Sequence, residues 1–511
     1  MTEVLVVGAG PTGLVLALWL NRLGVRVRIV DKAAEPGQAS RAVAVQARTL
    51  EFYRQMDLAG AFVEGGLPFA AANLWIEGER VGRMEFGSLG KGLSPFPYML
   101  VFPQDEHERV LTARLAAAGV EVERRTELVG LEGRDDGVTA RLARPDGTVE
   151  TCAVPYLAGC DGARSFARQA LGLEFPGGTY GHLFYVADIE GTGPQMNGEF
   201  HGAFDDSDFV AVFPLKGKDG QGRGRLIGTV REGTAGSGDH LEWKDVNQRV
   251  VDRIHLRVGQ VNWFSTYRVH HRVASAFRVR RVFLLGDAAH IHSPVGGQGM
   301  NTGIGDAVNL AWKLAATLRG TGPASLLDSF EQERVPFAQR LVKTTDRAFE
   351  LVSADGPIAK RVRLSVAPRL ITTAWRSTAL RRFLYKTLSQ IEIRYRRSSL
   401  SEGGAGRVHG GDRLPWVPSA SGGDNFDALR SLAWQAHVYG AASNALVRAC
   451  EASNIPLEVF PWTDDAARVG LARDGAYLVR PDGYVGLAAA GGEAASALER
   501  YVRAHGITPK A

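Results

Sequence analysis

A glycine-rich turn near the N-terminus constrains the fold of this chain more than any other feature. It follows a continuous apolar run, Val4–Val7, and precedes apolar residues at helical spacing from Leu14 to Leu23. A second apolar run, Val25–Val30, then leads to Asp31 and Lys32. The turn consists of Gly8, Ala9, Gly10, Pro11, Thr12 and Gly13. This order predicts a βαβ unit built on a buried parallel sheet.

Each glycine of the turn has its own physical reason in such a unit. Gly8 permits the tight turn, Gly10 lets the backbone approach a pyrophosphate, and Gly13 permits close packing of the helix on the strand. Free N–H groups at the helix N-terminus attract phosphate, and the Asp31 carboxylate is placed to accept hydrogen bonds from ribose hydroxyls. We expect a dinucleotide here, although the motif alone separates neither FAD from NAD nor a ligand site from a purely structural turn.

A second ligand-facing segment lies about 270 residues downstream. The apolar run Val282–Leu285 predicts a buried strand that delivers Gly286 and Asp287 to its carboxyl end. A glycine loop follows and opens a helix expected from about Met300 to Arg319. The carboxylate can accept hydrogen bonds from sugar-like hydroxyls, and the helix N-terminal amides can face an anionic ring such as a reduced flavin. Two such turns favour an extended cofactor over a nicotinamide cofactor alone.

The other segments complete an α/β pattern. An amphipathic helix is expected from Gln104 to Ala118, and a hairpin or meander between 122 and 150. Short aromatic and β-branched runs between 177 and 280 predict an antiparallel sheet inserted into the nucleotide-binding domain. Residues 357–397 have a basic helical pattern, which suits either a solvated face or a surface for a membrane or partner. Residues 398–411 resemble a Ser- and Gly-rich linker before a small α/β unit.

Composition narrows the class of protein. A chain of 511 residues favours two or three domains. The net charge of +5 is too modest to imply nucleic acid, and it suits phosphorylated cofactors or an ordinary basic surface equally. Three cysteines without a CxxC pair do not form a disulfide framework and fit a reducing cytoplasm. With no cationic leader and no membrane-length apolar run, we expect a cytoplasmic protein without a membrane span.

Three motifs, in this order, closely resemble the class A FAD-dependent aromatic hydroxylases, the group of para-hydroxybenzoate hydroxylase, phenol hydroxylase and the aromatic polyketide hydroxylases. The resemblance extends from residue 1 to about 345. The first turn matches the family's ADP-binding fingerprint, and residues 157–165 match its Asp-Gly motif, implicated in FAD and nicotinamide binding. Gly286 and Asp287 match the motif whose aspartate holds the flavin ribityl chain. Residues 40–42 and 48–51 and Gln104 also match family positions near the FAD.

The resemblance implies a set of site residues. Those expected to bind the cofactor are Gly8, Ala9, Gly10, Pro11, Thr12, Gly13, Asp31, Lys32, Ser40, Arg41, Gln104, Asp161, Gly162, Gly286, Asp287, Gly299, Met300 and Asn301. Those expected to position flavin and substrate are Pro294, Gly297 and Arg41. No metal is expected, because His290 and His292 lack carboxylate or cysteine ligands beside them and suit loop hydrogen bonding better.

The resemblance also implies the reaction. NADH or NADPH, as a transient co-substrate, reduces FAD, O2 adds at the flavin C4a carbon, and the resulting hydroperoxyflavin delivers one oxygen atom to an aromatic ring. The appended C-terminal unit favours a polycyclic phenolic or polyketide-type substrate, as in antibiotic biosynthesis. A Baeyer–Villiger or epoxidising monooxygenase on the same scaffold is the nearest alternative, and a non-catalytic FAD-binding sensor is a second. The partners expected are the aromatic substrate and O2, in a monomer or homodimer.

The implied architecture is an FAD-binding Rossmann-like βαβ domain with an inserted antiparallel β-sheet substrate domain and a C-terminal thioredoxin-like domain. The FAD-binding domain would comprise residues 1–176 and 271–350, the substrate sheet 177–270 with parts of 70–100, a helical connector 351–400, and the C-terminal domain 401–511. Because the last part lacks CxxC, packing or oligomer contact is its expected role.

Several residues keep two interpretations. The sheet aromatics could stack on a planar substrate or pack in the core; they are Phe184, Tyr185, Phe213 and Trp263. Asp161 could serve only its own turn, and Arg41 and Arg48 could form surface salt bridges. Tyr267 and His270 are candidates for a substrate base.

Overall fold

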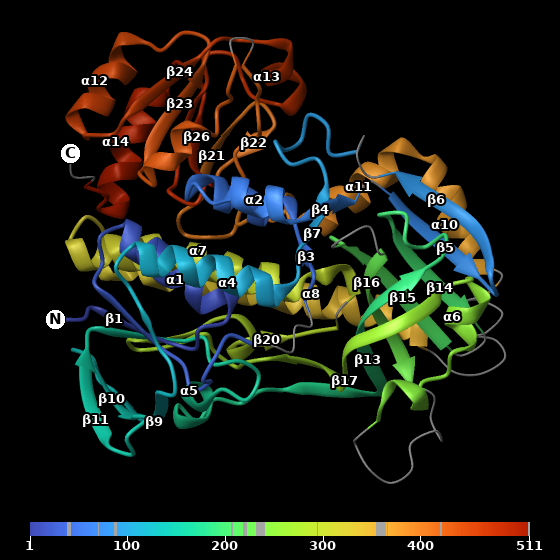
Figure 1. The fold of residues 1–511 in the computed structure, drawn as a ribbon. Helices are drawn as coiled ribbons and strands as arrows, with labels where there is room; N and C mark the ends of the chain where they lie inside the picture. Colours follow the sequence, from blue (N-terminus) through green and yellow to red (C-terminus); the bar gives the residue numbers. More distant parts are fainter. Residues whose placement is uncertain are drawn as a thin grey trace.

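The computed structural model describes residues 1–37, 42–69, 71–85, 89–205, 208–217, 222–230, 241–293, 295–353, 364, 366–419 and 422–508. Ser40, Arg41 and Pro294, expected at the site, lie outside the described residues. Within them, no helix is long and apolar enough to cross a membrane. Figure 1 shows two sheet-containing layers side by side below a C-terminal α/β unit.

The N-terminal fold is a six-stranded, mainly parallel sheet in the order β18-β19-β12-β1-β2-β8. Its strands are β1 (Val4–Val7), β2 (Val27–Val30), β8 (Val122–Glu123), β12 (Tyr156–Gly159), β18 (Arg278–Val279) and β19 (Val282–Leu284). Both β2 and β12 pair with β1 in parallel, and β19 pairs with β12 in parallel. Because adjacent parallel strands end at the same edge, the loops that follow β1, β12 and β19 come together there. These three loops carry the three motifs.

Three helices cover this sheet, and in Figure 1 they run side by side. They are α1 (Pro11–Arg22), α4 (Gln104–Ala117) and α7 (Gly299–Arg319). Each lies within one to three residues of its predicted bounds, because the apolar period of each is local to the sequence. The hairpin or meander expected between 122 and 150 is an antiparallel sheet of β9 (Glu127–Gly133), β10 (Val138–Ala143) and β11 (Val149–Val154).

The second layer is an eight-stranded sheet in the order β20-β17-β13-β16-β15-β14-β5-β6. Its strands are β5 (Ala71–Ile76), β6 (Glu79–Glu85), β13 (Gly177–Thr192), β14 (Phe200–Asp205), β15 (Asp208–Leu215), β16 (Gly222–Val230), β17 (Arg257–Val273) and β20 (His290–Ile291). It is antiparallel except that β14 pairs with β5 in parallel. The short β20 belongs to the loop after β19 and pairs with β17, so this sheet is joined directly to the third motif.

Smaller elements connect these layers. A three-stranded sheet contains β3 (Ala44–Val45), β4 (Leu67–Phe69) and β7 (Met99–Val101). The helices are α2 (Ala47–Gln55), α3 (Ala59–Gly65), α5 (Phe166–Ala170), α6 (Arg249–Arg253), α8 (Asp328–Ser353), α10 (Ala367–Arg376) and α11 (Thr378–Leu388). The basic segment predicted as helical to residue 397 is helical only to Leu388, and turns follow.

The C-terminal unit is a sheet in the order β22-β21-β26-β25-β23-β24. Its elements are β21 (Glu402–Ala405), β22 (Val408–His409), β23 (Gln435–Tyr439), α12 (Asn444–Ala452), β24 (Leu457–Phe460), α13 (Asp464–Val469), β25 (Ala476–Val479), β26 (Val485–Ala489) and α14 (Ala494–His505). Residues 398–411 are therefore not a linker, because they supply two of its strands. A Cβ at Gly403 would lie 2.2 Å from the carbonyl oxygen of Ala488, so that glycine serves close strand approach.

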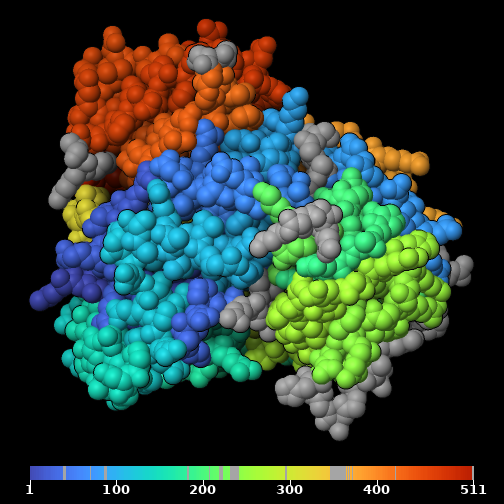
Figure 2. All heavy atoms as spheres, in the orientation of Figure 1, coloured from blue at the N-terminus to red at the C-terminus, as the bar shows by residue number. Residues whose placement is uncertain are grey.

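Buried ion pairs fasten this unit to the N-terminal fold, on which it lies in Figure 2. Glu333 of α8 is within 2.7 Å of Arg480, in the turn between β25 and β26, and within 2.9 Å of Lys313 of α7. Asp482 pairs with the same Arg480 at 2.6 Å. All four side chains are at most 2% exposed. Charges buried to this degree are held only where partners neutralise them, so the docking is specific.

Candidate active site

One cavity of about 470 Å³ lies between the motif edge of the first sheet and the inner face of the second. Nine of the residues predicted for the site line it: Gly10, Pro11, Thr12, Gln104, Gly162, Asp287, Gly297, Gly299 and Met300. Other predicted residues lie outside the lining: Gly8, Ala9, Gly13, Asp31, Lys32, Asp161, Gly286 and Asn301. The fold thus brings three segments that are far apart in sequence to one hollow.

The glycines of the first turn differ in their surroundings: two are required by close backbone packing, and one faces open space. Gly8 has φ +104°, and a Cβ there would lie 2.3 Å from the Cys160 carbonyl oxygen. A Cβ at Gly13 would lie 1.9 Å from the Gly8 carbonyl oxygen. By contrast, a Cβ at Gly10 would meet nothing within 4 Å. The bare backbone of Gly10 at the start of α1, open to the cavity, fits the close approach of a pyrophosphate.

Asp31 fixes the shape of this turn. Its carboxylate accepts hydrogen bonds from the backbone N–H of Ala9 at 2.6 Å and of Ala33 at 2.7 Å. Lys32 is exposed and lies 4.0 Å from Glu127. Neither Asp31 nor Lys32 lines the cavity described above.

Asp161 lies on the second motif loop, behind the cavity wall. One oxygen of its carboxylate accepts a hydrogen bond from the Ala167 N–H of α5 at 3.0 Å. The other oxygen, Oδ1, is buried and has no hydrogen-bond partner among the described residues. The next residue, Gly162, does line the cavity.

The third motif places a carboxylate in the cavity wall. Asp287 is exposed, whereas residues 282–286 and 288–290 around it are buried, and its side chain lines the hollow. Gly286, with φ +58°, packs so closely on α1 that a Cβ would lie 2.7 Å from Thr12 Oγ1. The two cofactor motifs are therefore in direct contact, as one extended ligand would require.

A buried network holds this loop. Asp306 of α7 accepts a hydrogen bond from the Gly286 N–H at 3.0 Å and lies 2.7 Å from His290 Nε2. Its other oxygen accepts from Arg334 of α8 at 2.6 Å. Burial alone would raise the pKa of Asp306, but the Arg334 guanidinium and the hydrogen bonds from His290 and the Gly286 N–H hold that pKa below its usual range. Among the described residues, no group of three His, Cys, Asp or Glu side chains could hold a metal.

A left-handed glycine pair forms the entrance to α7. Gly296 has φ +79° and Gly297 has φ +62°, a region that favours glycine. Asn301 Nδ2 donates to the carbonyl oxygens of Gly297 at 2.8 Å and of Ala44 at 2.9 Å. Asn301 therefore lies behind the wall and fastens the glycine loop to β3, while the start of α7 faces the cavity.

Comparisons with known proteins agree with this geometry. A family model described as an FAD binding domain matches residues 1–345. The 6-methylpretetramide 4-monooxygenase of Streptomyces rimosus is 35% identical, covering 94% of this chain and 90% of the relative. The pentachlorophenol 4-monooxygenase of Sphingobium chlorophenolicum is 31% identical over 84% of this chain and 78% of its own length. The solved structure of an anhydrotetracycline hydroxylase from Streptomyces rimosus matches with a TM-score of 0.77 at 29% identity, covering 100% and 99% of the two chains.

The chain belongs to the FAD-dependent aromatic monooxygenases. It is an enzyme whose cofactor is FAD and whose co-substrate is NADH or NADPH. The predictions of an FAD-binding α/β fold and of this enzyme class are confirmed.

The inner face of the eight-stranded sheet forms the apolar wall of the monooxygenase cavity. Phe213, Ile227, Tyr267 and Val269 line it. Among the aromatics with two interpretations, Phe213 alone lines the cavity. Tyr185 packs in the core on the opposite face, stacked on Phe264 with ring centroids 6.1 Å apart. Successive residues of a strand point to opposite faces, which is why neighbours in sequence separate here.

The remaining two aromatics pack within the sheet layer. Phe184 is buried beside Tyr267, with ring centroids 5.9 Å apart, and Trp263 packs in a small cluster with Val186. His270, a candidate base like Tyr267, also lines the cavity, and its Nδ1 lies 2.7 Å from Thr179 Oγ1.

Two polar groups in the wall, His292 and Ser293, were not among the predicted site residues, and the sequence indicated only loop hydrogen bonding for His292. His292 Nδ1 lies 2.8 Å from the Ser293 carbonyl oxygen, so Nδ1 carries the proton and Nε2 keeps its lone pair. Within the described residues, His292 Nε2 and Ser293 Oγ are buried without a hydrogen-bond partner. Burial lowers the pKa of His292 to about 4, which leaves a neutral acceptor in the wall. Their position between a strand and a glycine loop is the feature of the sequence that could have indicated these two residues.

Arg48 does not lie at the cavity. It is 2% exposed, pairs with Glu51 at 2.9 Å, and donates to the Asp482 carbonyl oxygen at 2.7 Å. The surface salt-bridge interpretation is wrong because this pair is buried against the C-terminal unit.

Proposed function

We propose that this monooxygenase hydroxylates a planar, fused-ring phenol bound between the glycine loop 296–299 and the inner face of the eight-stranded sheet. The observation that carries the proposal is a single cavity with one apolar aromatic wall and one polar wall of backbone amides and a carboxylate. A flat aromatic substrate suits such a hollow, because the apolar wall takes its faces and the few polar groups fix its orientation. Two of the relatives above are named for a pretetramide and an anhydrotetracycline, which are fused-ring compounds.

The polar wall would hold the cofactor. Gly10 and the start of α1 would take the pyrophosphate, Asp287 the ribityl hydroxyls, and the amides of Gly299 and Met300 the anionic edge of the ring. Bound FAD supplies the electron transfer and the activation of oxygen. The protein's own part is to position the substrate, exclude water and hold charge, and the backbone at Gly297 is placed to line the reaction point.

His292 would orient the substrate hydroxyl. Its Nε2 lone pair lacks a partner among the described residues and borders the glycine loop. An unpaired buried acceptor costs about 1–3 kcal/mol, and a phenolic O–H donor would recover that free energy. Tyr267 and His270 remain the candidates on the opposite wall.

We also propose the domain division that the sequence indicated, with a C-terminal thioredoxin-like domain. The sheet order β24-β23-β25-β26, with β23 and β24 parallel and β25 antiparallel to both neighbours, supports it. The helix α12 between β23 and β24 and the helix α14 after β26 complete that βαβ-ββα arrangement. The buried pairs of Glu333 indicate a packing role.

A product screen tests the function. FAD-loaded enzyme would be supplied with NADH or NADPH and O2 over matched fused-ring and single-ring phenols and a fused-ring ketone, with product mass and hydrogen peroxide measured together. Addition of one oxygen atom to a fused-ring phenol, with little peroxide, is expected. Preference for single-ring phenols would overturn the substrate class, and insertion into a ketone would indicate the Baeyer–Villiger alternative. Failure of bound FAD to oxidise NAD(P)H would favour the sensor.

The variant His292→Leu tests the orienting residue in the same assay. We expect it to raise the KM for phenols and the share of peroxide, while the KM for NAD(P)H stays unchanged. His292→Asn, which keeps an acceptor, should recover part of the coupling. Unchanged coupling in a folded, FAD-loaded His292→Leu variant would remove this residue from the site.

A further inference from the structure

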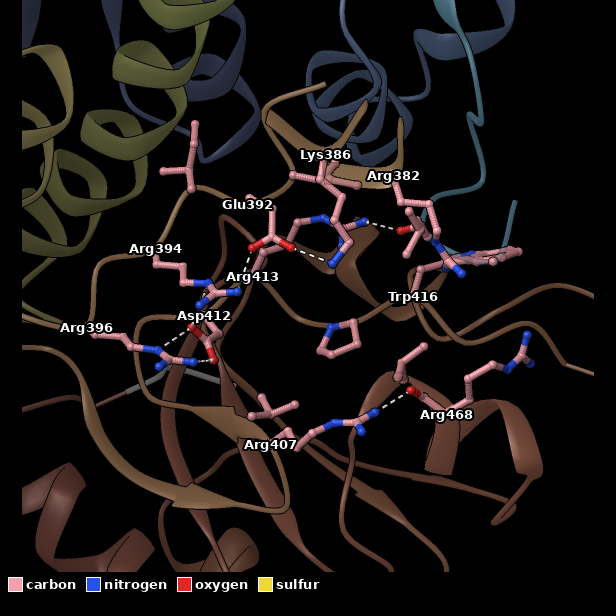
Figure 3. A pocket seen from close by; sticks show the side chains of 17 residues that line it. Arg382, Lys386, Glu392, Arg394, Arg396, Arg407, Asp412, Arg413, Trp416 and Arg468 are labelled. Atoms are coloured by element: carbon pink, nitrogen blue, oxygen red, sulfur yellow. Dashed lines mark hydrogen bonds and ion pairs between the residues drawn. The ribbon is translucent and has the colours of Figure 1, made fainter. Parts of the chain in front are cut away.

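A second cavity, of about 410 Å³, lies where α11 and the segment that follows it meet the C-terminal unit. It shares no lining residue with the active-site cavity. Figure 3 shows its side chains converging from α11, from residues 391–396, from the turn at Arg407 and from Arg468 of α13. The site therefore exists only because these separate parts pack together.

The wall of this second cavity is strongly basic. Seven of its seventeen lining residues are Arg or Lys, and two, Glu392 and Asp412, are acidic. Two further acids outside the lining, Glu51 and Asp465, pair with Arg413 and Arg468. After these four carboxylates are counted, an excess of three positive charges remains on the wall.

Two arginines carry most of the excess, and the third cation, Arg394, shares Glu392 with Lys386. Lys386 pairs with Glu392 at 2.6 Å and Arg396 with Asp412 at 2.7 Å. Arg382 and Arg407 are exposed and pair with no carboxylate of the described part of the chain. The Arg407 guanidinium donates to the Arg468 carbonyl oxygen at 2.5 Å, which leaves its charge uncompensated.

A solvated basic face does not explain this arrangement. Gathering like charges in a hollow is unfavourable because low-dielectric walls strengthen their repulsion. By contrast, Arg28 of β2 is neutralised by two carboxylates, because it pairs with both Glu123 and Glu150 at 2.6 Å. The concave wall, with Trp416 beside the basic groups, suits a small anion better than a flat membrane surface.

We propose that the second cavity binds the phosphate groups of a phosphorylated small molecule. Arg382 of α11 and Arg407, between β21 and β22, would both donate hydrogen bonds to the anion. Guanidinium groups bind phosphate oxygens through paired hydrogen bonds and remain charged at any physiological pH. Nucleotides and free diphosphate share this chemistry. The Trp416 ring offers a stacking surface that only the nucleotide would use.

Calorimetric titration of the FAD-loaded enzyme tests the proposal, because bound FAD blocks its own nucleotide site. The probes are inorganic pyrophosphate and ADP, and the variant is Arg382→Ala combined with Arg407→Ala. The matched control is Arg500→Ala combined with Arg503→Ala, which removes the same charge from the exposed face of α14. Flavin absorbance and thermal unfolding establish that both variants are folded and loaded.

We expect both probes to bind the parent enzyme. The Arg382/Arg407 variant should bind each about a hundredfold more weakly, about tenfold for each guanidinium that no longer donates to the phosphate, and the control less than about twofold more weakly. Tighter binding of ADP than of pyrophosphate would identify a nucleotide, and equal binding a free phosphate compound. The proposal is overturned if neither probe binds the parent, or if both variants weaken binding alike. Binding to anionic phospholipid vesicles, abolished in the Arg382/Arg407 variant while ADP fails to bind, would assign the surface to a membrane.

Discussion

The substitution Gly10→Ala tests whether the glycine at this position is required for cofactor binding or for folding. Gly10 has φ −75° and ψ −179°, a backbone conformation that alanine adopts freely. A Cβ there has no neighbour within 4 Å. The methyl group would project into space that a bound pyrophosphate would occupy.

The expected effects on stability and on binding differ in size. Alanine reduces the entropy of the unfolded chain, which stabilises by about 0.4–1 kcal/mol, but it is a poorer helix N-cap than glycine by a similar amount. The unfolding free energy of the apoprotein should therefore change by less than about 1 kcal/mol. Loss of hydrogen bonds to the charged phosphate costs about 1.5–3 kcal/mol, so the FAD dissociation constant should rise about tenfold to a hundredfold.

The assay pairs urea unfolding of the apoprotein with flavin fluorescence titration. Gly13→Ala is the matched control, because its Cβ would lie 1.9 Å from the Gly8 carbonyl oxygen. That variant should lose about 1–3 kcal/mol or more of folding stability through overpacking. If Gly10→Ala keeps the parent's affinity for FAD, or destabilises the apoprotein as Gly13→Ala does, the assignment of the pyrophosphate to this turn is refuted.

Three further outcomes are expected. Glu333→Gln should lower the unfolding free energy by about 3–5 kcal/mol because it leaves the buried Lys313 without its counter-charge and the buried Arg480 with Asp482 alone, whereas the exposed Glu132→Gln should change it by less than about 1 kcal/mol. Burial lowers the pKa of His437 to about 3; stability from this group is therefore complete above pH ~6.5 and declines below it at about 1.4 kcal/mol per pH unit. The variant His437→Gln should remove that part of the slope in urea unfolding, and an unchanged slope would contradict the pKa. Cys160→Ala should keep turnover per bound FAD, since burial raises the pKa of this thiol well above its usual value, and an inactive variant that retains FAD would reveal thiol chemistry.

Local patterns made the first sheet predictable. The runs Val4–Val7 and Val282–Leu285 are continuously apolar because both faces of a parallel strand are covered. Glycine turns mark where these strands end, and the parallel order brings the turns together. The position of Asp287 in the cavity wall follows from those two rules.

Glycine is a misleading signal wherever it serves packing rather than flexibility. The Ser and Gly content of residues 398–411 predicts a linker, yet Gly403 permits two strands to approach. Composition alone does not distinguish a glycine that frees the backbone from one that lets another backbone come close.

Contacts between distant segments escaped prediction for a different reason. Glu333 lies on α8 and its partner Arg480 in a turn nearly 150 residues later, and nothing in either local sequence marks them as partners. The same holds for the second cavity, where Arg382 and Arg407 are unremarkable singly and become a site only when α11 and the C-terminal unit pack together.

The two cavities are joined through the end of α11. Gln298, in the active-site glycine loop, donates to the Leu388 carbonyl oxygen at 2.8 Å, and its own amide oxygen accepts from Gln390 at 2.6 Å. A Cβ at Gly296 would lie 2.9 Å from the Leu388 side chain, so the backbone of that loop packs closely on the end of the helix. Because Lys386, in the last turn of that helix, lines the second cavity, a single short helix lines one cavity and contacts the loop that lines the other. The C-terminal unit is therefore connected to the active-site loop through α11, which lines the second cavity together with that unit and contacts the loop.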